Sequence, residues 1–300
     1  MIRFFFVFFV FNSFSFCSQA QNNGILPLTG LRYFNEGISA KSMEVRVDGS
    51  LLLNNRLPAN KEFEIRLVLP VGFTDKGKIV FPAAEYGIYS AKGELLSLIP
   101  NLFKDKESSG FSSAGFKELV VKIQLKPEQV RTEQSCIVKV RVYDIKSSNQ
   151  LRLEFPISIA RAGEVLQLSK SVNLAKSGSD VVAISNGVKI KSIVITVDTS
   201  IRINPKMAYM SLDMGEISGS GNSEILSGKE NFWIYDNNLN EIKVPDRQLK
   251  QIKSSMEDNI VDYLSKIPYR LKSAIGKIYT VRFRWESPDK HKIIDVVVTR

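Results

Sequence analysis

The residue types that most often carry catalysis are scarce in this chain. Its 300 residues include one histidine, His291, and two cysteines, Cys17 and Cys136. Zinc sites and catalytic triads need histidine or cysteine beside further ligands or a nucleophile. One histidine therefore excludes multi-histidine zinc patterns and argues against Ser-His-Asp and Cys-His catalysis. We interpret His291, which stands between two lysines, as a solvated loop residue.

Glycine-rich and acidic motifs also give no cofactor site. The segment Gly219-Ser220-Gly221 lacks a third glycine at the dinucleotide-binding spacing and no Gly-Lys-Ser/Thr accompanies it, so we interpret it as a loop. No calcium-binding Asp-x-Asp-x-Asn-Gly loop occurs. We therefore predict a non-catalytic protein with no metal and no cofactor. Two facing carboxylates suffice for glycoside hydrolysis, so a carboxylate-based glycosidase stays open as an alternative.

Two aromatic residues form the candidate binding site. In the segment 232–235, period-two alternation places Trp233 and Tyr235 on one face and Ile234 on the other. Exposed aromatic pairs stack on sugar rings or anchor protein contacts. Trp233 and Tyr235 are therefore the candidate ligand-binding residues, on an outer face of the sheet. The alternative, which the sequence favours because the helix over 246–267 needs an apolar surface, is that this helix covers both residues and makes them part of the core.

The segments that must position these side chains alternate apolar and polar residues. One example runs over 62–69, where Phe63, Ile65, Leu67 and Leu69 alternate with Glu62, Glu64 and Arg66. Such strands bury one face and expose the other, as in antiparallel sandwiches. The same alternation puts Cys136 on an apolar face, where we expect a buried, inert thiol. The pattern predicts an all-β chain of two tandem immunoglobulin-like antiparallel β-sandwiches.

The apolar–polar alternation weakens in one segment, which predicts a boundary between two domains. Between residues 161 and 187 small and polar residues dominate, which predicts one β-sandwich domain over 21–162 and a second over 163–300. An internal match supports this division, because 86–90 aligns with 232–236 and, further on, 138–143 aligns with 279–284. The second domain is therefore interpreted as a divergent copy of the first.

One segment of the second domain has helical spacing. Its apolar residues recur every three or four positions, at Leu249, Ile252, Met256, Ile260, Leu264 and Ile267. Asp246 is a suitable amino-terminal cap and Pro268 would end the helix. We predict a helix over 246–267 that covers one edge or end of the second sandwich.

The amino terminus predicts export. Arg3 precedes the apolar run 4–11, and Ser18-Gln19-Ala20 supplies the small residues of a cleavage site, so 1–20 is a predicted signal peptide and Gln21 the first mature residue. The run is shorter than the roughly 20 residues of a membrane span. Lipid anchoring through Cys17 is an alternative, although bulky phenylalanines stand where that processing requires smaller residues.

The net charge and the distribution of charged residues favour some classes of binding partner over others. The formal net charge is +10, and loss of Arg3 with the signal peptide would reduce it to +9. The charges are scattered without a block of one sign, which is typical of a solvated surface and gives no indication of a nucleic-acid partner. A modest positive excess suits anionic glycans or lipid head groups. We expect an envelope protein or a glycan as the partner, in the periplasm or at the cell surface.

Residues 262–298 resemble the first half of the TonB carboxy-terminal domain. The resemblance lies in Pro268-Tyr269, Gly276-Lys277, the strand 279–283 and a hairpin that leads into 294–298. It implies recognition of short β-segments of outer-membrane transporters by strand pairing. The chain as a whole is similar to exported tandem β-sandwich proteins of Gram-negative envelopes. These observations predict a non-catalytic envelope or surface interaction module, with a carbohydrate-binding protein and a glycosidase as alternatives.

Overall fold

The computed structural model describes residues 23–131, 134–177, 181–187, 192–198, 207–213, 228–242, 254–257, 260–266 and 280–299. Strands dominate these residues, which contain no α-helix and only two short 3-10 turns, at Lys104–Lys106 and Ser113–Gly115. The predicted all-β class is confirmed. None of the described segments forms an apolar helix of membrane-spanning length. The predicted signal peptide, Cys17 and Gln21 lie outside the described residues.

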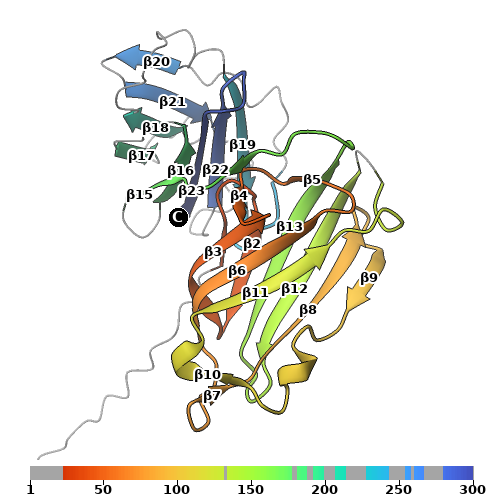
Figure 1. The fold of residues 1–300 in the computed structure, drawn as a ribbon. Helices are drawn as coiled ribbons and strands as arrows, with labels where there is room; N and C mark the ends of the chain where they lie inside the picture. The colour runs from red at the N-terminus through yellow and green to blue at the C-terminus, as the bar shows by residue number, and fades with distance from the viewer. Residues whose placement is uncertain are drawn as a thin grey trace, which may run out of the picture.

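Two sheets pack face to face in the N-terminal part, residues 23–169 (Figure 1). Sheet I has the order β1-β2-β13-β12-β8-β9, and β5 pairs in parallel with β13. Its strands are β1 Gly24–Ile25, β2 Arg32–Glu36, β5 Arg56–Pro58, β8 Pro82–Ser90, β9 Leu95–Ile99, β12 Ser135–Asp144 and β13 Gln150–Ala160. Sheet II has the order β11-β6-β3-β4-β14. Its strands are β3 Ser39–Val47, β4 Ser50–Leu52, β6 Glu62–Val71, β11 Glu118–Gln124 and β14 Leu168–Ser169; the short strands β7 Ile79–Val80 and β10 Phe111–Ser112 pair separately.

One apolar core fills the space between sheets I and II. In β6 the predicted alternation holds over 62–67, because Phe63, Ile65 and Leu67 are buried while neighbouring charged residues reach solvent. The prediction is wrong for Leu69, which is 42% exposed because the backbone changes direction there, at a φ of +47°. Phe63 meets Phe155 of β13 edge to face, with 5.6 Å between the ring centroids. Cys136 is buried in the same core, as expected, and burial raises the pKa of its thiol to about 11. Most of the core therefore comes from the inward-facing residues of alternating strands, and loop residues such as Leu31 and Ile38 complete it.

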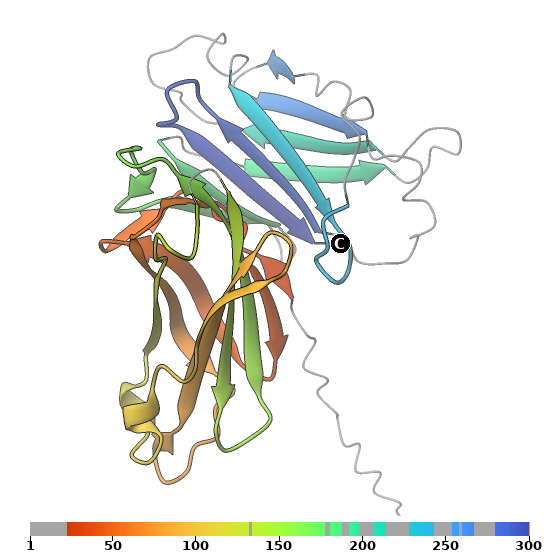
Figure 2. The same ribbon diagram turned by 90° about the vertical axis from the view of Figure 1, so that its right-hand side faces the viewer.

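Two further sheets form the C-terminal part, residues 173–299. Sheet III has the order β15-β16-β23-β22-β19, and sheet IV has the order β17-β18-β21-β20. Their strands are β15 Asn173–Ser177, β16 Val181–Asn186, β19 Lys229–Tyr235, β22 Thr280–Glu286 and β23 Ile293–Thr299, then β17 Ser192–Asp198, β18 Met207–Asp213, β20 Ser254–Glu257 and β21 Ile260–Lys266. Sheet III lies next to the N-terminal part, at one end of it (Figures 1 and 2).

The predicted helix over 246–267 is wrong where the structure describes it. Residues 254–257 and 260–266 are strands β20 and β21, which pair antiparallel with each other. Positions four apart share one side of a strand as well as one side of a helix, so the spacing of Ile260 and Leu264, both in β21, fits both. The hairpin of the TonB resemblance is present as β22 and β23, but a strand precedes it; the resemblance stays a hypothesis.

The described strands of the two parts do not pair with each other. The change from sheet II to sheet III falls between Ser169 and Asn173, a few residues after the predicted boundary near 163. The matched segments have corresponding neighbours, because β8 pairs with β12 and β12 with β13, while β19 pairs with β22 and β22 with β23. The domain limits, the internal repeat and the immunoglobulin-like topology stay predictions.

Candidate functional site

A cleft of about 790 Å³ lies between the N-terminal and C-terminal parts. The N-terminal part contributes the loops 28–32, 53–56 and 164–168, and the C-terminal part contributes residues of sheet III and the loop 289–291. Hydrogen-bonding side chains dominate its walls. The amides among them are Asn54, Asn55, Gln167, Asn186 and Asn231, and the charged groups include Arg32, Arg56, Glu164, Lys229, Glu241, Arg282, Arg284, Glu286, Asp289 and Lys290.

The loop 26–31 joins the N-terminal part to sheet III. It is closed by two backbone hydrogen bonds, from Leu26 N–H to the Leu31 carbonyl (2.8 Å) and from Gly30 N–H to the Leu26 carbonyl (3.0 Å). The turn places the Leu28 carbonyl oxygen within 2.7 Å of Arg282 Nη2 and 3.1 Å of Arg284 Nη1. A Cβ atom on Gly30 would lie only 2.3 Å from Arg282 Nη1, and its φ is +71°. Glycine is therefore strongly favoured at this position.

Arg282, Arg284 and Asp295 form a buried ionic cluster in sheet III. Asp295 Oδ2 lies 2.7 Å from Arg282 Nη2 and 3.2 Å from Arg284 Nη1, and the three side chains are 0–8% exposed. Arg284 also donates to Glu286 Oε1 at 2.8 Å. Burial acts to lower the pKa of Arg282, but the charge and hydrogen bonds of Asp295, together with Tyr235, outweigh burial and raise this pKa above its ordinary value. Two carboxylates thus balance two guanidinium groups, and no charge of the cluster is left uncompensated.

The structure places Trp233 and Tyr235 on the wall of the cleft. Tyr235 is only 5% exposed and packs with Ile25 and Leu239, and burial raises its pKa. Trp233 is partly buried, and the guanidinium of Arg282, its partner across the strands, lies 4.7 Å from its ring centre. The expectation of an exposed pair is therefore wrong for Tyr235. Its cover includes Ile25 of the N-terminal part. The alternative of a covering helix is wrong for the described residues 254–257 and 260–266, which are strands.

Sequence reasoning missed the ionic cluster and the loop that it binds. A signal for the cluster exists in the sequence, because Asp295 interrupts the apolar run of β23 and two arginines alternate in the strand before it. Charged residues at strand positions that are otherwise apolar indicate a buried ion pair. No comparable signal identifies Leu28, whose contribution is a backbone carbonyl.

Two carboxylates of the cleft, those of Glu164 and Asp289, have lowered pKa values. Hydrogen bonds from Arg56, including one of 2.8 Å from Nη2, lower the pKa of Glu164 to about 2. The Ser287 hydroxyl and the His291 N–H lower the pKa of Asp289. The general acid of a glycosidase needs the opposite, a raised pKa. Within the described residues no group of three or more histidine, cysteine or acidic side chains is arranged to hold a metal ion.

Comparisons with known proteins provide no family for the chain. No protein family and no curated protein matches the sequence. Among solved structures, the crystal structure of the C-terminal domain of wzt matches with a TM-score of 0.33 and 10% identity, over 48% of this chain and 87% of that one. A likeness this distant carries no argument about fold or function.

Proposed function

We propose that this protein is an exported, non-catalytic binding module of the cell envelope or surface, and that its partner occupies the cleft between the two parts. The cleft carries the proposal: about 790 Å³ lies within the usual range for ligand sites, and both parts contribute hydrogen-bonding side chains to it. The chain as a whole is then a pair of tandem immunoglobulin-like sandwiches, in which the C-terminal part is a divergent copy of the N-terminal part.

The paired charges support binding over catalysis. Arg56 is fixed by Glu164, and Arg284 by Glu286, so these groups are oriented before a ligand arrives. Groups held in place lose little conformational entropy on binding, which favours affinity. A carboxylate whose pKa lies near 2 stays ionised and accepts hydrogen bonds, but it does not deliver a proton at neutral pH.

Carbohydrate binding is the second candidate function, and the chemistry of the cleft walls favours it. Five amide side chains surround the cleft, and amides match the paired donors and acceptors of sugar hydroxyl groups. Trp233 adds an aromatic ring on the wall. Lys229 and Lys290, which also line the cleft, suit a glycan that carries carboxylate or phosphate groups.

Binding to the cleft is testable with matched variants. The mature protein, starting at Gln21, is used on a glycan array and in capture from a native envelope extract. We expect Asn231→Ala and Lys290→Glu, both in the cleft, to weaken binding of the captured partner at least tenfold. Asn237→Ala, an exposed amide outside the cleft, is the control and should bind like the unaltered protein. Unchanged binding by both cleft variants, or release of a hydrolysed sugar, contradicts the proposal.

Export is tested separately by the mass and amino-terminal sequence of the protein recovered from its own cell envelope. We expect the chain to begin at Gln21. An unprocessed Met1, or a lipid on Cys17, would contradict this start.

A further inference from the structure

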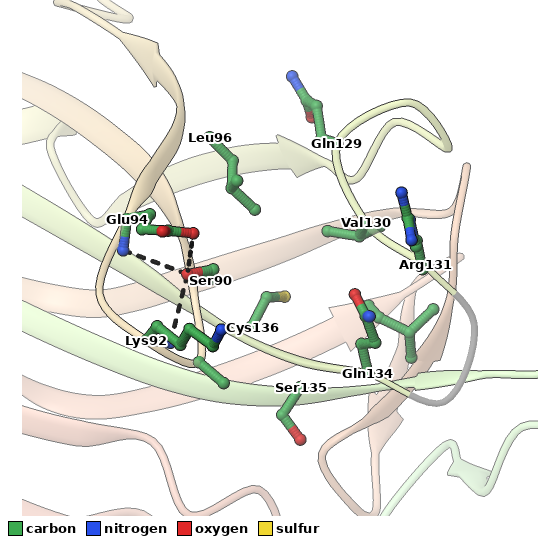
Figure 3. A pocket seen from close by; sticks show the side chains of 12 residues that line it. Ser90, Lys92, Glu94, Leu96, Gln129, Val130, Arg131, Gln134, Ser135 and Cys136 are labelled. Atoms are coloured by element: carbon green, nitrogen blue, oxygen red, sulfur yellow. Dashed lines mark hydrogen bonds between the residues drawn. The ribbon is translucent and has the colours of Figure 1, made fainter.

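A second pocket, of about 400 Å³, shares no lining residue with the cleft. It opens between the β8–β9 hairpin, the start of β12 and residues 129–131 and 134 (Figure 3). The side chains of Leu96, Val130 and Cys136 converge on its floor (Figure 3). An apolar floor of this kind fits a short aliphatic side chain.

Among the described residues that line this pocket, basic residues outnumber acidic ones. Lys92 and Arg131 are basic, and Glu94 is acidic. The Glu94 carboxylate accepts a hydrogen bond from the Ser90 hydroxyl at 3.3 Å. Gln129 and Gln134 add amide donors to the rim (Figure 3). The rim is therefore complementary to a carboxylate that arrives from outside.

The strand next to the pocket has a free edge. Among the described strands β9 pairs only with β8, so one row of its backbone groups has no strand partner. Four of its five residues are exposed and apolar, among them Leu95 and Leu98 at 53% each. At an edge of sheet II, β11 instead exposes charged side chains such as Glu118 and Lys122. Charged edges discourage strand addition, and an apolar uncharged edge permits it.

The direction of β9 determines which end of an added segment lies at the pocket. The strand begins at Leu95, directly after the turn that contains Lys92 and Glu94, and it runs away from the pocket. A segment added antiparallel to β9 therefore has its carboxyl end beside the pocket. Its last side chain meets the apolar floor, and its terminal carboxylate meets Lys92 and Arg131.

We propose that β9 and this pocket bind the extended, apolar carboxyl terminus of another exported protein by strand addition. The backbone edge supplies hydrogen bonds, the pocket selects the last side chain, and the basic rim selects the free carboxylate. A fatty acid would leave the backbone groups of β9 without partners. A second copy paired through β9 would place no terminal carboxylate at the rim. This site is additional to the cleft and does not depend on what the cleft binds.

The test uses the mature protein and the hexapeptide Thr-Val-Thr-Val-Thr-Leu, once with a free carboxylate and once amidated. We expect the free acid to bind at least ten times more tightly in calorimetric titration, because the amide removes the charge that Lys92 and Arg131 recognise. The double variant Lys92→Glu/Arg131→Glu should abolish this difference. Lys126→Glu, in the neighbouring loop outside the pocket, is the control and should keep it.

The edge is tested with a second pair of variants. Leu98→Lys adds a charge to the free edge and should weaken both peptides at least tenfold, whereas Val71→Lys, at a similarly exposed apolar residue of β6, should have no effect. Asn231→Ala in the cleft should leave peptide binding unchanged, which separates this site from the proposed function.

The two peptides are compared on the unaltered protein, so the proposal can be rejected even if no variant folds. Absence of peptide binding, or equal affinity for the acid and the amide, rejects the carboxylate site. Binding of decanoate without binding of the peptide identifies a lipid pocket. A dimer that the peptide does not dissociate identifies a second copy as the occupant of β9.

Discussion

The core between sheets I and II and the contact between sheet III and the loop 26–31 depend on opposite kinds of interaction. The core is apolar throughout, with Phe63 and Phe155 in edge-to-face contact at its centre. The contact is ionic and directional, because two buried guanidinium groups converge on one carboxylate and one backbone carbonyl. Apolar burial is tolerant of the exact partner, whereas the hydrogen bonds at Leu28 require one position and one backbone conformation.

This difference determines which substitutions lower the free energy of unfolding most in each region. In the core the cost of a substitution follows the volume that is removed. In the ionic cluster the loss of stability depends on the charge that is left without a partner. The buried charges offset one another's desolvation, so removing one charge leaves the desolvation of its partner uncompensated. The two regions therefore respond differently to changes of similar size, and four measurements test this comparison.

The largest effect is expected in the core. Phe155→Ala removes a fully buried ring and should lower the free energy of unfolding of the N-terminal part by about 3–5 kcal/mol. Urea denaturation followed by circular dichroism measures it. Val165→Ala, at a residue that is 90% exposed, is the control and should change stability by less than about 0.5 kcal/mol. A loss below about 1 kcal/mol for Phe155→Ala would show that the site is loosely packed.

The ionic cluster should give the next largest effect. Asp295→Asn keeps the shape and one hydrogen-bond acceptor but leaves two guanidinium groups with less negative charge, and we expect a loss of about 2–3 kcal/mol. Asp105→Asn, at an exposed acid of the Lys104–Lys106 turn, should be neutral. The comparison fails if Asp295→Asn is as harmless as this control.

The backbone of the loop 26–31 is tested at Gly30. Gly30→Ala adds a methyl group at positive φ and against Arg282, so we expect a loss of about 1–2 kcal/mol. Hydrogen exchange of the Gly30 amide, which donates to Leu26, should accelerate at the same time. Gly49→Ala shares the positive φ but has open space around its Cβ position, so it isolates the strain from the clash. Equal losses for both variants would mean that contact with Arg282 contributes nothing.

The smallest effect concerns the partly exposed ion pair between Arg56 and Glu164. Because the pKa of Glu164 is lowered from 4.5 to about 2, the pair stabilises the folded state fully above pH 4.5 and loses this effect as pH falls toward 2. The Glu164 side chain is 32% exposed, so solvent screening keeps the contribution below about 1 kcal/mol. Glu164→Gln should therefore lower the urea midpoint slightly at pH 7 and less at pH 3. A gap that widens on acidification would contradict this assignment.

Alternation was sufficient to predict the strands that carry the core, because each residue of β6 or β13 faces either the other sheet or solvent. It was not sufficient for 246–267, where a spacing of four fits a strand and a helix equally. It also placed Trp233 correctly on a strand, but what covers a strand face depends on distant segments. The donor on Arg282 and its acceptor on Leu28 are 254 residues apart, and no local pattern connects them.

The hydrogen bond between Leu28 and Arg282 forms late in folding, because its two residues lie near opposite ends of the chain. A chain that leaves a ribosome or a translocation channel with its amino end first presents the Leu28 carbonyl long before β22 and β23 have followed. The sandwich of sheets I and II uses only residues up to 169, so it can close early, whereas the cleft has no second wall until sheet III forms. The cleft is thus complete only when nearly the whole chain has emerged, and a product truncated before β22 would lack the wall that sheet III provides.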